Sequence, residues 1–442
     1  MLAKPMKIKG AWPMNTSRRN ARGEATLRSI LAESVGLLGR YGYAGTTISR
    51  ITKVTGKPAS SIYWFFPTKD ELLAAALEGT YQSDVENLSA WPQYTSDLGL
   101  REQLVQILTP AFTSSETEGP VRLGIMVVLE GSSEGSMARE PFRRRRQRAR
   151  KQIHEWWSTA SKAFGGNQHD DIAERMVRLT IAFLDGHYIS DVRCDDSPQA
   201  QRGELVAIAL CHAFYDLLES SDVVNLPLKK ETRIQPTEPL EAIDGEDKLL
   251  SSARSLVAER SYEGATLALI GERAGMQRSS IYWRYKGKDE LIRDAVAEPF
   301  LRLAGTTLPS TRTDEGTLLV NLAKSIADGV AASMSSPDTV KAGLLLKLQR
   351  RDPLSLASEA IQRGLVAQEA EMEQWLEVAI ADRPRVDPAI LAWMLNVLKE
   401  GLMLGVAFGY VYDVELLEGA CASMIGGVLD DLARDPAEPH MQ

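Results

Sequence analysis

Two short segments of the chain carry small polar residues beside an aromatic hydroxyl and a lysine. The sequence Ser-Ser-Ile-Tyr-Trp occurs at residues 60–64 and again at 279–283, and Lys-Asp-Glu-Leu follows at 69–72 and 288–291. Hydroxyl and ammonium groups of this kind bind phosphate oxygens, and small residues beside them let a backbone approach a groove closely. The pattern therefore indicates nucleic-acid binding.

The elements around the first segment have the order of a helix-turn-helix. Apolar residues recur at helical spacing over residues 24–40, which predicts a first helix. Thr47 begins a short helix that ends near Val54, Gly56 makes a tight turn, and a third helix covers about 58–64. Thr68 and Glu71 then form the pattern of a capping box, which Gly287 interrupts in the second copy.

The similarity between the two copies extends far beyond these segments. At an offset of 219 residues the alignment needs no gap from Leu37 and Leu256 onward, and Trp156 matches Trp375. Leu184-Asp-Gly aligns with Lys399-Glu-Gly at an offset of 215. We therefore interpret the chain as a duplication of whole halves.

Positive charge gathers around the repeated segments although the whole chain is acidic. The 442 residues carry a formal net charge of -8. Residues 53–69 contain three cations and no acid, and residues 273–288 contain five cations and no acid. This distribution favours two local sites for a polyanion rather than a uniformly basic surface.

Several classes of protein are excluded by composition and motifs. No run of about 20 apolar residues predicts a membrane span, and the N-terminal residues lack the apolar stretch of a secretion signal. The cysteines, Cys194, Cys211 and Cys421, have no metal-binding spacing and indicate a reduced, cytoplasmic protein. Motifs of hydrolases, nucleotide-binding enzymes and metalloenzymes are absent from the sequence, so we expect neither catalysis nor a cofactor.

The rest of the chain predicts an all-α fold. Long helical patterns cover about 101–115, 120–133, 139–163, 170–193 and 202–219, with counterparts up to Leu432. Proline and charged residues interrupt the pattern between the halves. We expect a basic arm (1–21), a first head (22–78), a first effector and dimerisation domain (79–220), a linker (221–244), a second head (245–297) and a second effector and dimerisation domain (298–434).

Both heads resemble the DNA-binding domain of the TetR family of bacterial regulators. The resemblance rests on Gly-x-Thr-x-x-x-Ile-x-x-x-x-Gly, followed by Ile-Tyr-x-x-Phe-x-x-Lys-x-x-Leu, over about 22–77, and on its second copy, with Tyr285 in place of the Phe, over 245–296. It implies phosphate contacts from Thr47, Tyr63 and Lys69 and from their counterparts, and base contacts from the recognition helices. The expected DNA-binding residues of the first head are Thr46, Thr47, Lys57, Ala59, Ser60, Ser61, Tyr63, Trp64 and Lys69. Those of the second head are Thr266, Gln277, Arg278, Ser279, Ser280, Tyr282, Trp283, Arg284 and Lys288.

The sequence departs from the family pattern at several positions. Pro58 and Gln277 stand where serine or threonine is usual, and Ser60 and Ser279 stand where glycine is usual. A degenerate second head with a structural role is the alternative to two active heads, and Trp64 and Trp283 fit either base contact or packing.

The resemblance also implies dimerisation through the last two long helices of each unit. We expect the two halves to pair within one chain as a pseudo-dimer, with higher oligomers left open. Six glycines suit close helix packing in the second half: Gly401, Gly405, Gly409, Gly419, Gly426 and Gly427. The heads differ just before the repeated segment, so the operator is expected to be an imperfect palindrome with two unlike half-sites.

A ligand-responsive repressor is the function that the resemblance implies, with an apolar pocket for a small hydrophobic effector in each half. The candidate pocket residues are Met126, Glu130, Trp156, Trp157, Phe183, His187, Leu345, Gln349, Trp375, Met394 and Met403. Ordinary core packing is the alternative for each, and a DNA-binding regulator or scaffold without an effector and with one degenerate head is the alternative function.

Two further basic segments have no assigned role. The arm from Lys4 to Arg22 fits either a DNA contact or a solvated tail. Residues 143–146 are four consecutive arginines, and their counterpart contains Glu369, Glu371 and Glu373. A solvated helix face and a charge-complementary contact between the halves are both compatible with this pattern.

Overall fold

The fold is described from a computed structural model. It describes residues 21–85, 91–113, 119–130, 136–165, 169–190, 199–219, 247–305, 315–350, 352–381, 383 and 385–433. All regular elements in these ranges are helices, so the expectation of an all-α fold is confirmed. Most of the basic arm and the whole expected linker lie outside the described residues.

The first half contains nine helices among the described residues. They are α1 (Ala21–Gly45), α2 (Ile48–Thr55), α3 (Ala59–Phe65), α4 (Lys69–Val85), α5 (Leu100–Thr113), α6 (Pro120–Leu129), α7 (Ser136–Ala163), α8 (His169–Ile189) and α9 (Gln199–Glu219). The expected helices of this half are present, with ends that differ by a few residues.

The second half repeats this order. Its elements are α10 (Lys248–Gly264), α11 (Leu267–Ala274), α12 (Arg278–Arg284), α13 (Lys288–Ile292), a π-helix η2 (Arg293–Ala297), α14 (Glu298–Ala304), α15 (Glu315–Ser335), α16 (Pro337–Leu348), α17 (Leu356–Ala379), α18 (Pro388–Ala407) and α19 (Val414–Ala433). α13, η2 and α14 together occupy the place that α4 has in the first half.

The halves pack together through their last two long helices, α8 on α18 and α9 on α19. Gly186 and Gly401 allow the closest approach. A Cβ atom at Gly186 would lie 1.8 Å from the carbonyl oxygen of Val397, and one at Gly401 would lie 1.7 Å from that of Ala182. α8 and α18 therefore touch backbone to backbone, which any larger side chain would prevent.

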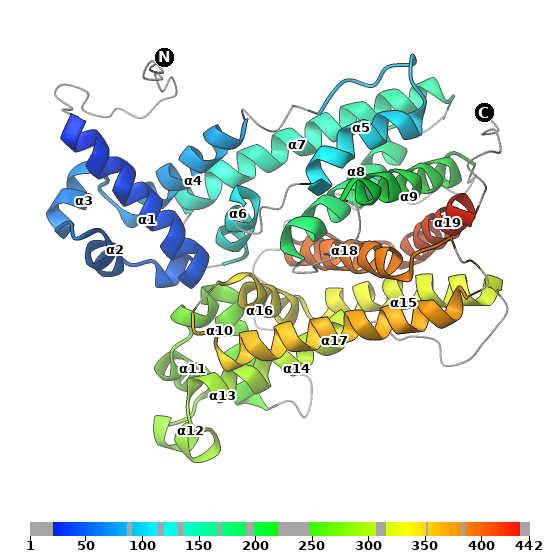
Figure 1. Cartoon of the computed structure of the whole chain (residues 1–442). Coiled ribbons are helices and arrows are strands. Elements are labelled where there is room, and N and C mark those ends of the chain that lie inside the picture. The colour runs from blue at the N-terminus through cyan, green and yellow to red at the C-terminus, as the bar shows by residue number, and fades with distance from the viewer. Residues whose placement is uncertain are drawn as a thin grey trace.

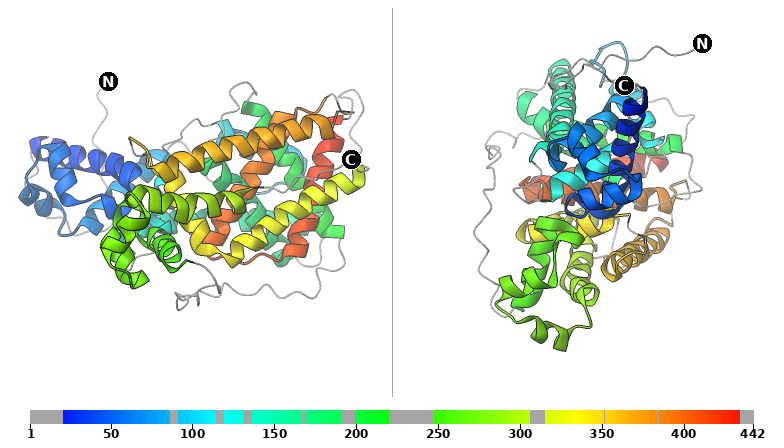
Figure 2. Two further views of the ribbon diagram at one scale, coloured as in Figure 1. Left: turned by 90° about the horizontal axis from the view of Figure 1, so that it is seen from below. Right: turned by 90° about the vertical axis from the view of Figure 1, so that its left-hand side faces the viewer.

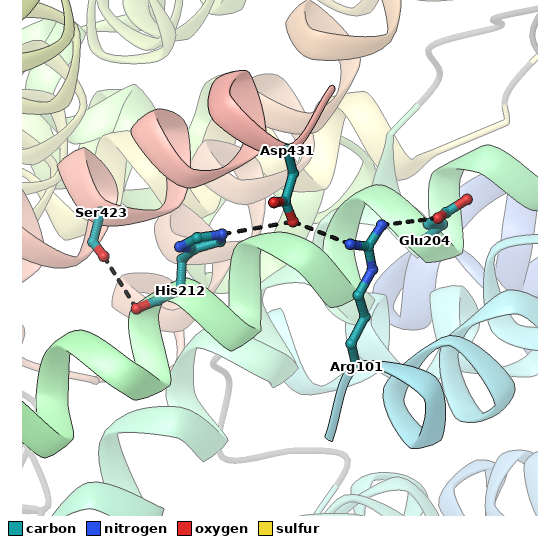
Figure 3. A network of polar contacts seen from close by, with 5 residues as sticks. All are labelled: Arg101, Glu204, His212, Ser423 and Asp431. Carbon is teal, nitrogen blue, oxygen red and sulfur yellow. Dashed lines mark hydrogen bonds and ion pairs between the residues drawn. The ribbon is translucent and has the colours of Figure 1, made fainter. Parts of the chain in front are cut away.

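Polar contacts join α9 and α19 beside this crossing (Figure 3). Asp431 of α19 lies between Arg101 of α5 and His212 of α9, at 3.1 Å from Arg101 Nη1 and 3.7 Å from His212 Nε2. The Ser423 hydroxyl donates to the His212 carbonyl at 3.1 Å. A Cβ at Gly427 would lie 2.0 Å from the His212 ring, so a second glycine of the expected set serves this interface.

The other glycines of that set do not all serve the interface. A Cβ at Gly405 would meet the Tyr412 hydroxyl inside the second half, and Gly409 has a φ of 90° after α18. Gly419 lies on an exposed part of α19 with nothing within 4 Å of an added Cβ. Close packing between the halves therefore uses only part of the glycine-rich sequence.

The two heads lie at one end of the molecule, and the four packed helices lie toward the other end (Figures 1 and 2). The first head comprises α1–α3 and the second comprises α10–α12, and α1 packs directly against α10. One hydrophobic core contains residues of both heads, including Leu38 and Tyr43 from the first and Leu256 and Tyr262 from the second.

One described helix, α18, has the length and apolarity of a membrane span. However, 89% of its most apolar window is buried inside the protein, which is the character of a core helix. Cys211 and Cys421 are also buried and free, and burial raises the pKa of each thiol to about 12. Cys194 lies outside the described residues.

Candidate nucleic-acid interface

The first head places a short exposed helix beside a rigid turn. Thr47 caps α2, since its hydroxyl accepts a hydrogen bond from Arg50 N at 3.2 Å. Gly56 ends α2 with a φ of 65°, a conformation that favours glycine. Ile62 anchors α3 in the core of the head, and this leaves the other faces of α3 exposed.

The second head has the same local structure. The Thr266 hydroxyl accepts from Leu269 N at 3.3 Å and caps α11, and Gly275 ends α11 with a φ of 68°. Ile281 anchors α12 as Ile62 anchors α3. The second head therefore keeps the geometry of a helix-turn-helix despite its departures from the family pattern.

Most of the predicted DNA-binding residues lie at the surface of the heads. Exposed in the first head are Thr47, Ala59, Ser60, Tyr63 and Trp64, and exposed in the second are Thr266, Gln277, Arg278, Ser279, Ser280, Tyr282, Trp283 and Arg284. Lys57 and Ser61 are half-buried. Trp64 and Trp283 are 67% and 88% exposed, so neither is a core residue of this chain.

Thr46 is not part of this surface, which corrects its prediction as a DNA-binding residue. Its side chain is fully buried, and its hydroxyl donates to the Gly42 carbonyl at 2.7 Å. It satisfies a carbonyl at the bend of α1 and has no free donor to offer a phosphate.

The two predicted phosphate-binding lysines are engaged with tyrosines. Lys69 Nζ lies 3.8 Å from the centre of the Tyr43 ring and donates to the Tyr43 carbonyl at 3.0 Å. Lys288 Nζ lies 4.1 Å from the centre of the Tyr262 ring. Each lysine therefore ties the helix after the recognition helix to the end of the first helix, and remains half-exposed.

Arg284 and Arg278 differ in their surroundings. Arg284 forms an ion pair with Asp247, whose carboxylate also caps α10. Arg278 carries its guanidinium 5.6 Å from the Tyr282 ring and donates to the Tyr282 hydroxyl at 3.2 Å. Because Arg278 is held in place while exposed, it is better prepared than Arg284 for a bidentate base contact.

The predicted cap by Thr68 forms after α3, and Glu71 reaches back to the Thr68 hydroxyl. Glu71 N donates to the Thr68 hydroxyl at 3.1 Å, and that hydroxyl donates to the Glu71 carboxylate at 3.1 Å. Gly287 offers no such bond at the start of α13. The two copies therefore differ in how the helix after the recognition helix begins.

The candidate effector residues are divided between two buried cores of the structure. Trp156, Trp157, Phe183 and Met394 are buried in a core that spans both halves. Trp375 is partly buried against this core. Met126, Leu345 and Met403 are buried in the core shared with the heads. Core packing, the alternative that the sequence left open, describes these positions.

The polar members of the same set are also held by the protein. His187 packs against Phe112 with their ring centres 4.8 Å apart, and burial, followed by the charge of Arg202, lowers its pKa to about 4. Glu130 accepts hydrogen bonds from backbone amides of the first head, and Gln349 lies beside it. Glu130 therefore connects the first effector domain to the first head.

The arginine-rich start of α7 pairs mainly within its own half. Arg146 makes two hydrogen bonds to Asp185 at 2.8 and 2.6 Å, and Arg144 lies 3.0 Å from Glu78. The ion pairs of Arg144 and Arg146 lie within the first half, so neither residue forms the charge-complementary contact that was one of the two alternatives. Arg146 does reach the other half through the Phe408 ring, at 4.6 Å.

The contact between the heads was not predicted from the sequence. Arg50 of the first head lies 3.3 Å from Glu263 of the second. The duplication makes α1 and α10 equivalent helices, but it does not pair these two residues, since they are not equivalent positions.

Two exposed helix-turn-helix units on one helical chain define a DNA-binding protein. The family model described as "Bacterial regulatory proteins, tetR family" matches residues 30–76 and 249–295, one match in each head. Each head therefore contains the DNA-binding domain of this family, and the chain carries two such domains in tandem.

A curated relative matches over a short region. The biofilm operon icaADBC HTH-type negative transcriptional regulator IcaR of Staphylococcus epidermidis is 33% identical over 54 residues, which is 12% of this chain. The match spans only 29% of the length of that relative.

Proposed function

We propose that this chain is a transcriptional regulator that acts as a repressor. It binds one operator with both heads and is released by a small hydrophobic effector. The packing of α8 on α18 and of α9 on α19 carries this proposal, because it joins the two halves inside one chain. Both heads then lie at the same end of the molecule, where one stretch of duplex can meet them (Figure 1). The negative regulator among its relatives supports a repressor role.

The operator is an imperfect palindrome, because the two recognition helices differ where bases are read. Ala59 and Arg278 occupy equivalent positions at the start of α3 and α12. Alanine can only make an apolar contact, for example with a thymine methyl group, whereas arginine can bind a guanine through two hydrogen bonds. The two half-sites therefore differ at the base pair under this position.

Arg278→Ala is expected to weaken binding by about 1–3 kcal/mol and to abolish the preference for one base pair in the second half-site only. Tyr63→Phe, which removes the equivalent phosphate-binding hydroxyl from the first head and leaves the bond between Arg278 and Tyr282 intact, is the matched control and should weaken all sequences equally. Binding to a panel of operators with single base changes measures both effects. A loss of preference in the first half-site would contradict the assignment.

The stoichiometry of the DNA complex tests the pairing of the two heads. One chain of 48.7 kDa is expected on the shortest fully protected operator, with both half-sites protected in a footprint. Sedimentation of the complex gives its mass. Two chains on that duplex, or protection of one half-site only, would overturn the single-chain arrangement.

The effector is a small apolar or aromatic molecule in this proposal. Among the described residues a depression of about 450 Å³ lies between η2, α14 and α17, and its lining combines the apolar Ala297, Leu301 and Ala360 with the charged Arg293, Asp294, Glu298 and Arg302. Stabilisation by apolar compounds in a thermal-shift screen, and release of DNA by the same compounds, would distinguish an effector-controlled repressor from a scaffold without one.

In this proposal the chain consists of a basic arm, two heads, two effector domains and a linker, with the boundaries predicted from the sequence. The protein acts in the cytoplasm on double-stranded DNA. In this arrangement the exposed residues of α3 and α12 read bases, while Thr47, Tyr63, Thr266 and Tyr282 hold phosphates.

A further inference from the structure

The first helices of the two heads bend where they meet. α1 bends at Gly42, with a φ of 68°, and α10 bends at the equivalent Ser261, with a φ of 55°. The bend in α1 leaves two backbone amides without helical partners. The amides of Tyr43 and Ala44 donate instead to the Glu130 carboxylate, at 3.0 and 2.9 Å.

Polar side chains from both halves converge at this bend. A Cβ atom at Gly42 would lie 2.1 Å from Glu130 Oε1, 3.0 Å from Gln349 Nε2 and 3.2 Å from the Ser261 hydroxyl. Glu130 directly follows α6, and Gln349 is its counterpart after α16. All three side chains are buried. Gly42 thus makes room for a polar cluster between the heads, which we call the head junction.

Further bonds cross from one half to the other beside the cluster. Arg350 N donates to the Gly39 carbonyl of α1 at 3.0 Å, a bond that the bend in α1 makes available. Arg50 Nη2 lies 3.3 Å from Glu263 of α10, while Arg50 Nη1 donates to the Gly45 carbonyl at 2.6 Å. Residues of the second half therefore contact both the backbone and a side chain of the first head beside the head junction.

The head junction is complementary but not symmetric. At an offset of 219, Arg50 corresponds to Leu269, and Glu263 corresponds to Ala44. The ion pair can therefore form only once across the axis, and the carboxylate of Glu130 faces an amide at the equivalent Gln349. Divergence has produced two unlike sides that fit each other, which identical subunits could not supply.

We propose that the head junction holds the two recognition helices at one separation and so makes the regulator selective for the number of base pairs between its half-sites. Glu130 and Glu263 are positioning residues in this proposal. Glu130 holds the first head on its own effector domain, and Glu263 of the second head pairs with Arg50 of the first. The inference rests on the proposed function, namely that both heads bind one operator.

The physical reason is the geometry of the duplex. One added base pair moves a half-site by about 3.4 Å and rotates it by roughly a tenth of a turn. Two linked heads gain from simultaneous binding only if their separation matches that of the half-sites. Heads held together by the packing of α1 on α10 and by these polar contacts cannot follow the displaced half-site, whereas heads with weaker contacts can follow it further.

The test measures the affinity for the selected operator and for versions with one or two base pairs inserted or removed between the half-sites. The wild-type protein is expected to lose about tenfold in affinity for a change of one base pair. The double variant Glu130→Gln/Glu263→Ala is expected to bind the best operator less tightly but to lose less than about threefold for the same change.

Glu259→Ala is the matched control, because Glu259 pairs with Arg273 inside the second head and not across the axis. It should keep the wild-type dependence on spacing. Circular dichroism and thermal unfolding establish that each variant is folded. The same dependence on spacing in the double variant as in the wild type would overturn the proposal. A wild-type protein that ignored spacing altogether would instead overturn the binding of both heads to one operator.

The pH dependence supplies a second readout of the same contact. Burial raises the pKa of Glu130 to about 7, although the Ser261 hydroxyl, the Ala44 and Tyr43 amides and the Lys69 charge act in the opposite direction. Arg139 of α7 is the other charge that acts on this carboxylate. From the second half, the neutral groups of Ser261 and Gln349 lie beside it.

The sign follows from the direction of this pKa change. A closed junction keeps the proton on Glu130 up to a higher pH than an opened, solvated one does, so acidification favours the closed state. Selectivity for spacing should therefore be steeper at pH 6 than at pH 8 in the wild type. Glu130→Gln should remove this difference, and a difference that persisted in the variant would contradict the role of Glu130.

Discussion

Gly401→Ala is expected to destabilise the protein by about 3 kcal/mol or more and to separate the two halves. The added Cβ would lie 1.7 Å from the carbonyl oxygen of Ala182 and 2.8 Å from its Cα. Backbone atoms of α8 cannot move aside as a flexible side chain can, so α8 and α18 must shift apart. Urea unfolding measures the stability, and proteolysis of the folded variant reports loosening between the halves.

Gly419→Ala provides the control for this substitution. Gly419 lies within α19, the next helix of the second half, but an added Cβ would have nothing within 4 Å. Alanine has the higher helix propensity, so this variant should gain up to about 1 kcal/mol. Equal effects of the two substitutions would show that α8 and α18 do not meet at Gly401.

Lys347→Met is expected to cost about 3–5 kcal/mol, because it leaves a buried carboxylate without its cation. Lys347 of α16 forms an ion pair with Glu400 of α18, and the side chains are only 2% and 10% exposed. Burial, together with the charges of Glu400 and Glu373, already raises the pKa of Glu369 to about 7 against the charge of Lys347. The cost should therefore shrink at low pH, where these carboxyl groups take up protons.

Two further variants separate the charge effect from packing. Lys347→Met/Glu400→Met removes both partners and should recover most of the stability in urea unfolding. Lys324→Met removes an exposed lysine that pairs with Asp328 on the surface of α15, and should leave stability unchanged. A single Lys347→Met variant as stable as the wild type would contradict the buried ion pair.

The two halves satisfy the equivalent α8 and α18 carboxylates in different ways. Asp185 of α8 binds Arg146 of α7, whereas its counterpart Glu400 binds Lys347 of α16. Lys347 corresponds to Val128 in the first half, and Arg146 corresponds to Leu365 in the second. After the duplication both halves therefore kept a buried acidic residue at this position, but the cation that pairs with it comes from a different helix in each half. The sequence of one half does not reveal this difference.

The sequence alone determined the duplication, the all-α class, the two helix-turn-helix units and most of their exposed residues. These features depend on interactions between residues close together in the chain. Thr47 and Thr266 cap their helices from three residues away, Gly56 and Gly275 end them, and the apolar spacing marks the buried face. Such short-range interactions do not depend on how the rest of the chain packs.

Only the tertiary structure decided how distant residues are used. Glu130 was expected in an effector pocket, but it binds the Tyr43 and Ala44 amides some 86 residues earlier in the chain. Thr46 stands beside an exposed phosphate-binding candidate, yet its side chain points to the Gly42 carbonyl. Arg144 and Arg146 of α7 form ion pairs with acidic residues of α4 and α8 and not with those of α17. A buried polar or charged side chain must find its partner in whatever helix packs against it, and that choice is made by the packing of the two halves, not by the residues on either side of it in the sequence.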